Sequence, residues 1–105
     1  MRAASLAPSE IALLGSVFER HPEIVEVRLF GSRAKGTHTP QSDIDIALLG
    51  EVTPLQAQAA AAELDELPLH YQYDVQPFGR IKSNLLREHI ERVGIPLYRS
   101  TASRP

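Results

Sequence analysis

Two short segments alternate between apolar and other residues with a period of two, and this pattern constrains the fold more than any other feature of the chain. The segments read IVEVRLFG at 24–31 and DIDIALLG at 43–50. A period of two places every second side chain on the same face of an extended strand. The apolar faces hold Val25, Val27 and Leu29 in the first segment and Ile44, Ile46 and Leu48 in the second. Both segments are therefore predicted to be strands with one buried face.

Helical patterns surround these strands. Before the first strand, Ser9 is expected to cap a helix that stops near His21 and Pro22. After the second strand, Pro54 starts an alanine-rich helix that Pro68 closes. The apolar face of a last amphipathic helix is outlined by Ile81, Leu85, Leu86, Ile90 and Val93. Three main helices are thus predicted.

Two further strands are predicted in the second half of the chain. The segment HYQYDVQPF at 70–78 alternates again, and one of its two faces is wholly polar. Gly94 is expected to cap the last helix, after which 95–99 forms a short edge strand. This order of elements indicates an α/β or α+β fold, a small mixed sheet with helices packed against it.

The length of 105 residues fits a single domain over 1–105, with its core at about 9–99 and a loose tail at 100–105. No apolar run approaches the roughly 18 residues that span a bilayer, so we expect a cytoplasmic protein with no membrane partner. The absence of cysteine excludes thiolate zinc sites and disulfides. The four histidines do not have the close spacing of a zinc site.

The charge balance disfavours a nucleic-acid partner. Eleven Lys and Arg stand against thirteen Asp and Glu, which gives a formal net charge of -2. Such a chain has no general attraction for a polyanion, and it lacks a basic stripe with interleaved aromatic residues. Any chemistry on phosphates must depend on a local cluster of residues.

Three aspartates are the candidates for such a cluster. Asp43 and Asp45 are two apart in a predicted strand, so their side chains leave the same face. Asp74 lies within another predicted strand, where aspartate is disfavoured. If the two strands are neighbours with matching faces, the three carboxylates can bind divalent cations, and Mg²⁺ suits such oxygen ligands. Each aspartate taken alone could instead be a turn residue or a solvated strand residue.

The segment between the first two strands, GSRAKGTHTPQS, is rich in turn-forming residues and reads as a tight turn or short helix followed by a loop. Gly31 and Gly36 have the spacing of a P-loop, but Thr37 stands where the P-loop lysine is required. What remains is a glycine that allows close backbone approach, followed by the hydroxyl of Ser32. Taken alone, this turn could equally be a solvated connection between strands.

Gly31 and Ser32, ten intervening residues, Asp43-Ile44-Asp45 and a later Asp74 together resemble the minimal nucleotidyltransferase family of the DNA polymerase beta-like superfamily. The similarity extends over roughly 11–99. It implies the nucleotidyltransferase fold and two Mg²⁺ ions.

The resemblance also implies roles for single residues. Gly31 and Ser32 would bind the triphosphate of ATP. Asp43 and Asp45 would bind the two Mg²⁺ ions, and Asp74 would bind the catalytic ion and act as a base beside the attacking hydroxyl. Charge and proximity add two cations to the nucleotide-binding set, Arg33 and Lys35.

Small members of this family resemble antitoxins that add AMP to a tyrosine of a HEPN-type toxin. We therefore expect the chain to be a Mg²⁺-dependent adenylyltransferase with a HEPN-type toxin as its partner. Two alternatives stay open: an antitoxin that neutralises its partner by contact alone, and the catalytic half of an enzyme that modifies small molecules such as antibiotics.

Overall fold

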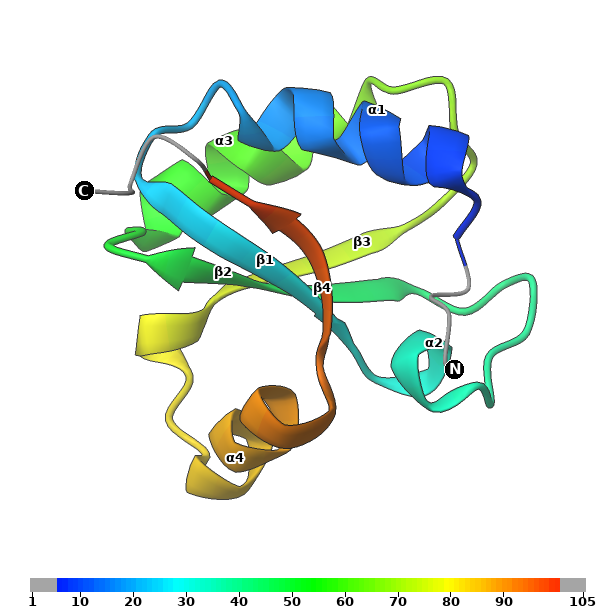
Figure 1. The fold of residues 1–105 in the computed structure, drawn as a ribbon. Coiled ribbons are helices and arrows are strands. Elements are labelled where there is room, and N and C mark those ends of the chain that lie inside the picture. Colours follow the sequence, from blue (N-terminus) through cyan, green and yellow to red (C-terminus); the bar gives the residue numbers. More distant parts are fainter. Residues whose placement is uncertain (1–5, 101–105) are drawn as a thin grey trace.

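The computed structural model describes residues 6–100, and helices and strands alternate along this part of the chain (Figure 1). The elements are α1 (Pro8–Phe18), β1 (Ile24–Phe30), α2 (Ser32–Lys35), β2 (Ile44–Gly50), α3 (Pro54–Asp65), β3 (Tyr73–Pro77), a 3-10 turn (Phe78–Arg80), α4 (Asn84–Val93) and β4 (Ile95–Arg99). The predicted strands and main helices are all present, and the predicted turn after β1 contains the short helix α2.

The four strands form one mixed sheet in the order β3-β2-β1-β4. Strand β1 is antiparallel to both β2 and β4, whereas β2 and β3 are parallel. A parallel pair needs a crossover, and here α3 provides it. The prediction of a small mixed sheet with packed helices is confirmed.

Helices α1 and α3 cover one face of the sheet (Figure 1). The main core lies between them and the strands, and its fully buried members include Leu14, Val17 and Phe18 of α1, Ile24, Val27 and Leu29 of β1, Ile44, Ile46 and Leu48 of β2, and Ala60 and Leu64 of α3. Two of the alanines of α3, Ala57 and Ala60, are buried in this core.

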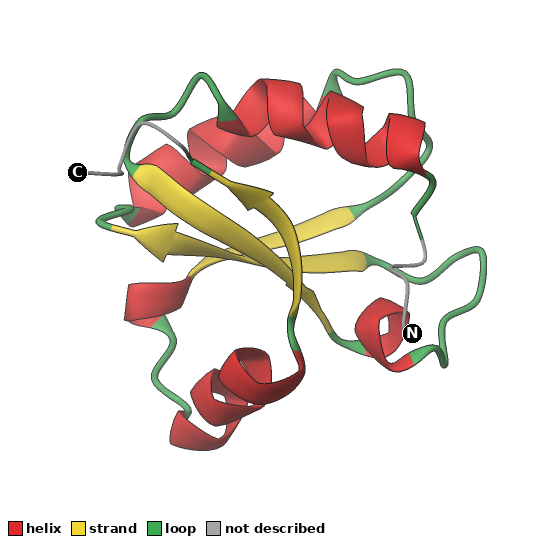
Figure 2. Cartoon of the chain, viewed as in Figure 1, coloured by secondary structure: helices red, strands yellow, loops and turns green. Residues whose placement is uncertain are grey.

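Helix α4 lies on the opposite face (Figure 2). A smaller cluster of Phe30, Ala47, Ile81 and Ile90 joins it to the sheet. Arg28 anchors the C-terminal end of α4, because its guanidinium donates to the carbonyl of Glu91 at 3.2 Å. Asp45 shares a strand face with Ala47, so this is also the face on which the predicted carboxylates lie.

Three local expectations from the sequence are wrong. Val25 is 39% exposed because the register of β1 shifts between Ile24 and Glu26, and the bulge moves Val25 off the core face. Leu85 and Val93, both expected on the buried face of α4, are 81% and 38% exposed. Ala7, not Ser9, is the N-cap of α1, and its backbone N–H donates to the carboxylate of Glu10 at 2.9 Å.

The first residue of the predicted loose tail at 100–105 belongs to the folded domain. Ser100 is buried, and its backbone N–H donates to the carbonyl of Val25 at 2.8 Å, so the sheet pairing continues to this residue. The rest of the predicted tail, 101–105, lies outside the described residues. Within residues 6–100, no helix is long and apolar enough to cross a membrane.

Helix capping gives a first test of this fold. Thr53 accepts a hydrogen bond from the backbone N–H of Gln56 at 3.1 Å, so Thr53→Ala is expected to lower the free energy of unfolding by about 1 kcal/mol. Ser9→Ala is the matched control, and we expect less than about 0.5 kcal/mol for it because Ser9 does not cap α1. Urea unfolding followed by circular dichroism measures both changes. A larger loss for Ser9→Ala than for Thr53→Ala would contradict the assigned caps.

Candidate active site

The parallel pairing of β2 with β3 places two aspartates directly opposite each other. Asp45 is the register partner of Asp74, and their neighbours Ile46 and Val75 are paired in the same way. Asp45 is half-buried and Asp74 is exposed. The two strands are therefore neighbours with matching faces, which was the condition for the predicted carboxylate cluster.

The carboxylate of Asp45 is in an unfavourable environment for a negative charge. Burial raises its pKa above the ordinary value, and the negative charges of Asp74 and Asp43 raise it further. A side-chain hydrogen bond with Asp74 acts in the same direction. On the other side of the pair, the amide of Gln76 donates to Asp74 Oδ2 at 3.4 Å. All three predicted aspartates thus interact electrostatically around Asp45.

Gly31 lies against this cluster because β1 ends beside Asp45. Phe30 is the register partner of Asp45, and Gly31 follows with φ 75° and ψ -155°, a conformation that is open almost only to glycine. A Cβ atom at position 31 would stand 2.2 Å from Asp45 Oδ2. The group that lies close to the backbone of Gly31 in this structure is the carboxylate of Asp45, and the expected approach of a phosphate to Gly31 stays a prediction.

The short helix α2 follows at once and places Ser32 next to Gly31 at its start. Ser32 is half-buried, while Lys35 is exposed in the last turn of this helix. Gly36 then ends α2 in the left-handed conformation with φ 82°. The Gly-Ser turn and the carboxylates therefore meet at the same end of β1 and β2, as the sequence predicted for two parts of one site.

Arg33 has contacts that the sequence did not suggest. Its side chain is almost fully buried, with 4% of the residue exposed. Its Nε donates to the carbonyl of Ser42 at 3.1 Å, and Nη2 lies 3.5 Å from the carbonyl of Thr39. The guanidinium also stacks 4.9 Å from the ring centroid of Tyr71. These groups all belong to the chain itself, and the expected contact of Arg33 with a phosphate stays a prediction.

Tyr71 is the supporting residue that sequence reasoning missed. Its hydroxyl donates to Glu10 of α1 at 2.9 Å, so α1, Tyr71 and Arg33 form one connected series. Burial, followed by the hydrogen bond to Glu10, raises the pKa of this tyrosine. The aromatic residue in a polar run was visible in the sequence, but its contact with an arginine 38 positions earlier was not.

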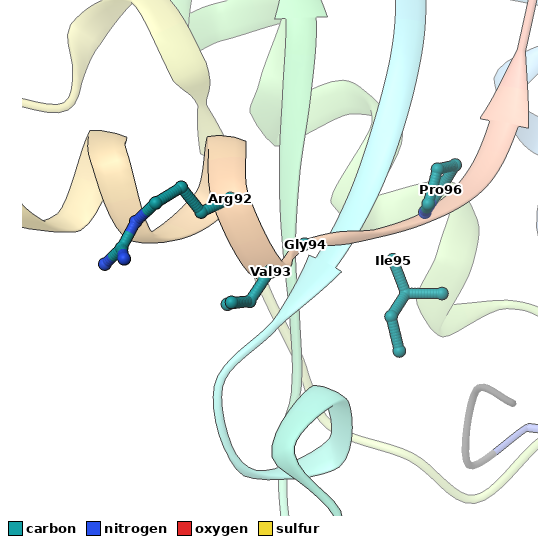
Figure 3. A pocket seen from close by; sticks show the side chains of 5 residues that line it. All are labelled: Arg92, Val93, Gly94, Ile95 and Pro96. Atoms are coloured by element: carbon teal, nitrogen blue, oxygen red, sulfur yellow. The ribbon is translucent and has the colours of Figure 1, made fainter. Parts of the chain in front are cut away.

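No group of three acidic, histidine or cysteine residues within 6–100 is arranged to hold a metal ion by itself. A pocket of about 440 Å³ lies at the junction of α4 and β4, where Val93, Ile95 and Pro96 are among the lining residues (Figure 3). Another pocket lies at the far end of β2, near Gly50 and Arg80. None of the predicted site residues lines either of these two pockets.

Gly31 and Gly36, two of the three glycines with a positive φ within residues 6–100, provide a matched pair of substitutions. Gly36→Ala introduces only conformational strain, because a Cβ there meets nothing within 4 Å, and we expect a loss of about 1 kcal/mol in the free energy of unfolding. Gly31→Ala adds a clash with Asp45, so its loss should be greater by roughly 1 to 2 kcal/mol. Chemical denaturation measures both variants. Equal losses would show that the carboxylate moves aside without cost.

The raised pKa of Asp45 predicts a pH-dependent penalty. A carboxyl group whose pKa is higher in the folded chain costs no stability below the ordinary value of about 3.9, and costs most once the pH exceeds the raised value. Asp45→Asn removes this penalty. Without divalent cations near pH 7, we expect it to be more stable than the parent chain by on the order of 0.5 kcal/mol.

The stability gain of Asp45→Asn should shrink as the pH falls toward 4, because the parent carboxyl group becomes neutral. Unfolding curves at several pH values, with Asp65→Asn as the control for an exposed aspartate outside the site, provide the measurement. A gain that does not change with pH would rule out charge as its origin.

Solved structures with the same fold are known. The chain resembles a toxin–antitoxin complex with AMP-PNP at 25% identity and a TM-score of 0.70, over 92% of this chain and 77% of the other. It resembles a mutant MntA–HpeT toxin–antitoxin complex at 23% identity and a TM-score of 0.69, over 92% and 77%. A tri-AMPylated Shewanella oneidensis HEPN toxin in complex with an MNT antitoxin matches at 20% identity and a TM-score of 0.65, over 90% and 73%. No curated protein sequence matches significantly.

The sequence itself matches one protein family. The model described as polymerase beta, nucleotidyltransferase, covers residues 13–102, which is most of the chain. The mixed sheet, the Gly-Ser turn and the paired aspartates all lie within this span. The predicted resemblance to the polymerase beta-like superfamily is confirmed, and the chain belongs to the polymerase beta nucleotidyltransferase family.

Proposed function

We propose that the chain is an antitoxin that transfers AMP from ATP to a hydroxyl group, with tyrosine the first candidate, of a HEPN-type toxin. The observation that carries this proposal is the register that pairs Asp45 with Asp74 beside the backbone of Gly31. Family membership supports the type of reaction. The similarity to toxin–antitoxin complexes, one with AMP-PNP and one with a tri-AMPylated HEPN toxin, supports the nucleotide and the partner.

The donor set fits Mg²⁺. Asp45 and Asp74 are opposed carboxylates with a raised pKa at Asp45, and a divalent cation would turn their repulsion into attraction. Mg²⁺ needs only one or two carboxylates when waters and phosphate oxygens complete its shell, so a cage of three protein ligands is not required. Asp43, which also acts on Asp45, is the third candidate ligand, and we propose two ions as in other two-metal sites.

The nucleotide is proposed to lie along the Gly-Ser turn. The missing side chain at Gly31 leaves room for the Asp45 carboxylate at the start of this turn, so the proposed phosphate contacts are the backbone of the turn and the Ser32 hydroxyl, which can donate to phosphate oxygens. Lys35, exposed on the same short helix, can add a positive charge. Mg²⁺ bound by the aspartates would neutralise charge on the phosphates during transfer.

The reaction joins one oxygen to phosphorus and releases another. The acceptor hydroxyl attacks the α-phosphorus of ATP, the bond to the β-phosphate oxygen breaks, and pyrophosphate leaves while AMP stays on the acceptor. The hydroxyl proton passes to the carboxylate of Asp74, which we propose as the base. Asp74 is exposed, so a hydroxyl on the surface of another protein can reach it. ATP and Mg²⁺ are both available in the cytoplasm, where we place the chain.

The test combines the purified chain, Mg²⁺, ATP labelled at its α-phosphate and the protein encoded next to it. We expect labelled AMP on a tyrosine of that protein, located by mass spectrometry. Asp45→Asn and Asp74→Asn should each reduce the rate roughly a hundredfold or more, because each removes charge from the proposed metal site. Asp65→Asn, an exposed aspartate outside the site, is the matched control and should keep the parent rate.

Two outcomes would count against this function. Absence of transfer to any protein or small hydroxyl compound would remove the enzymatic proposal. Full protection of cells by an Asp43→Ala, Asp45→Ala double variant would show that neutralisation needs contact but no catalysis.

A further inference from the structure

Arg33 connects the two parts of the candidate site. We infer that this residue positions Asp43 by holding the loop before it, and that it does not bind the phosphates of the nucleotide. The inference rests on the proposed function, since it gives Arg33 a role in the same reaction. It is carried by the burial of the side chain and by the groups that its guanidinium contacts.

The hydrogen bond from Arg33 to Ser42 fixes the peptide unit that precedes Asp43. Arg33 Nε donates to the carbonyl oxygen of Ser42 at 3.1 Å. This oxygen and the backbone N–H of Asp43 belong to one planar peptide group. A bond that holds the carbonyl therefore also sets the direction in which the chain enters Asp43.

A second backbone anchor stands on the other side of Asp43. The N–H of Ile44 donates to the carbonyl of Gln72 at 2.8 Å, which begins the parallel pairing of β2 with β3. The exposed Asp43 lies between these two anchors, and its orientation is set through the backbone. Without the contact from Arg33, one of the two anchors is lost, and Asp43 can turn away from Asp45.

The loop itself is built to present the carbonyl of Ser42. The side-chain oxygen of Ser42 accepts a hydrogen bond from the backbone N–H of Thr39 at 2.8 Å, and the backbone N–H of Ser42 donates to the carbonyl of Thr39 at 3.0 Å. These bonds close a tight turn from 39 to 42. Arg33 reaches both ends of this turn, since Nη2 also lies 3.5 Å from the Thr39 carbonyl.

Burial of the charge explains why an arginine stands here. A guanidinium with 4% exposure needs acceptors for its fixed fork of donors, and the loop carbonyls and the face of Tyr71 provide them. Because Ser32 is the preceding residue on α2, the same helix carries a proposed phosphate contact and the clamp on the metal-binding loop. A lysine would keep the charge but could not match this planar fork.

The experiment compares Arg33→Met and Arg33→Lys with Arg80→Met, an exposed arginine at the far end of the sheet. Steady-state AMP transfer gives kcat and KM for ATP, and hydrogen exchange by mass spectrometry reports the amides of residues 37–44 in the nucleotide-free chain. We expect both Arg33 variants to lose roughly tenfold to a hundredfold in kcat with less than about threefold change in KM, and to exchange faster in this loop. Arg80→Met should match the parent chain.

The opposite pattern would overturn the inference. If Arg33 binds phosphate, Arg33→Met should raise KM for ATP about tenfold or more, whereas Arg33→Lys should keep most of the activity. Hydrogen exchange in the loop should then be the same in both variants and in the parent chain. Should Arg33→Met fail to fold, Arg33→Lys alone distinguishes the two roles. Absence of AMP transfer by the parent chain would refute the proposed function only, because loop exchange in the variants still decides whether Arg33 holds Asp43.

Discussion

The parallel pairing of β2 with β3 is the constraint on which the rest of the site depends. It aligns Asp45 with Asp74 and so places two negative charges at neighbouring positions of one sheet face. The α3 crossover makes this pairing possible, and the main core under β2 holds its register, since a slip by one residue would bury the carboxylate side and expose Ile44 and Ile46. The stability of the core is thus what keeps an unfavourable charge pair together.

The repulsion between the Asp45 and Asp74 carboxylates has a physical explanation if the two groups bind a cation together. Burial and two neighbouring carboxylates disfavour the charge on Asp45, while the sheet gives it no arginine or lysine in the opposite register position. Functional sites commonly retain such local destabilisation because the ligand reverses it. Gly31 belongs to the same compromise, since only a residue without a side chain leaves room for the carboxylate.

The sequence predicted the strands and helices well because each has a strong local pattern, but it could not determine how the strands pair. Alternation tells which side chains share a face of one strand, and it does not tell which strand lies beside it. The bulge at Val25 reversed the face of that residue, because one extra residue shifts a period-2 pattern. Leu85 is exposed although Leu86 and Ile90 of the same helix pack on the smaller cluster, so the predicted apolar face of α4 is wider than the surface that the helix buries.

The residues of the candidate site also separate into those that local sequence patterns predict and those whose contacts depend on the fold. Asp43, Asp45 and the Gly-Ser turn were predictable because their short spacing on one strand and one turn is a local feature. Arg33 was predicted from its charge alone, and charge suggested a phosphate. The contacts behind the positioning role inferred for Arg33 come from a loop up to nine residues away and from Tyr71 in a distant segment, and only the folded chain brings these together.

The arrangement of layers also limits how an acceptor can approach. Helices α1 and α3 close one face of the sheet, whereas α4 covers only part of the face that carries the carboxylates (Figure 1). Asp74 is exposed on this partly open face, and the two pockets described above lie elsewhere. An exposed carboxylate can be reached by a hydroxyl on the surface of another protein. The exposure of Asp74 therefore meets one requirement of the antitoxin proposal, which needs a carboxylate that a hydroxyl carried by a protein can reach.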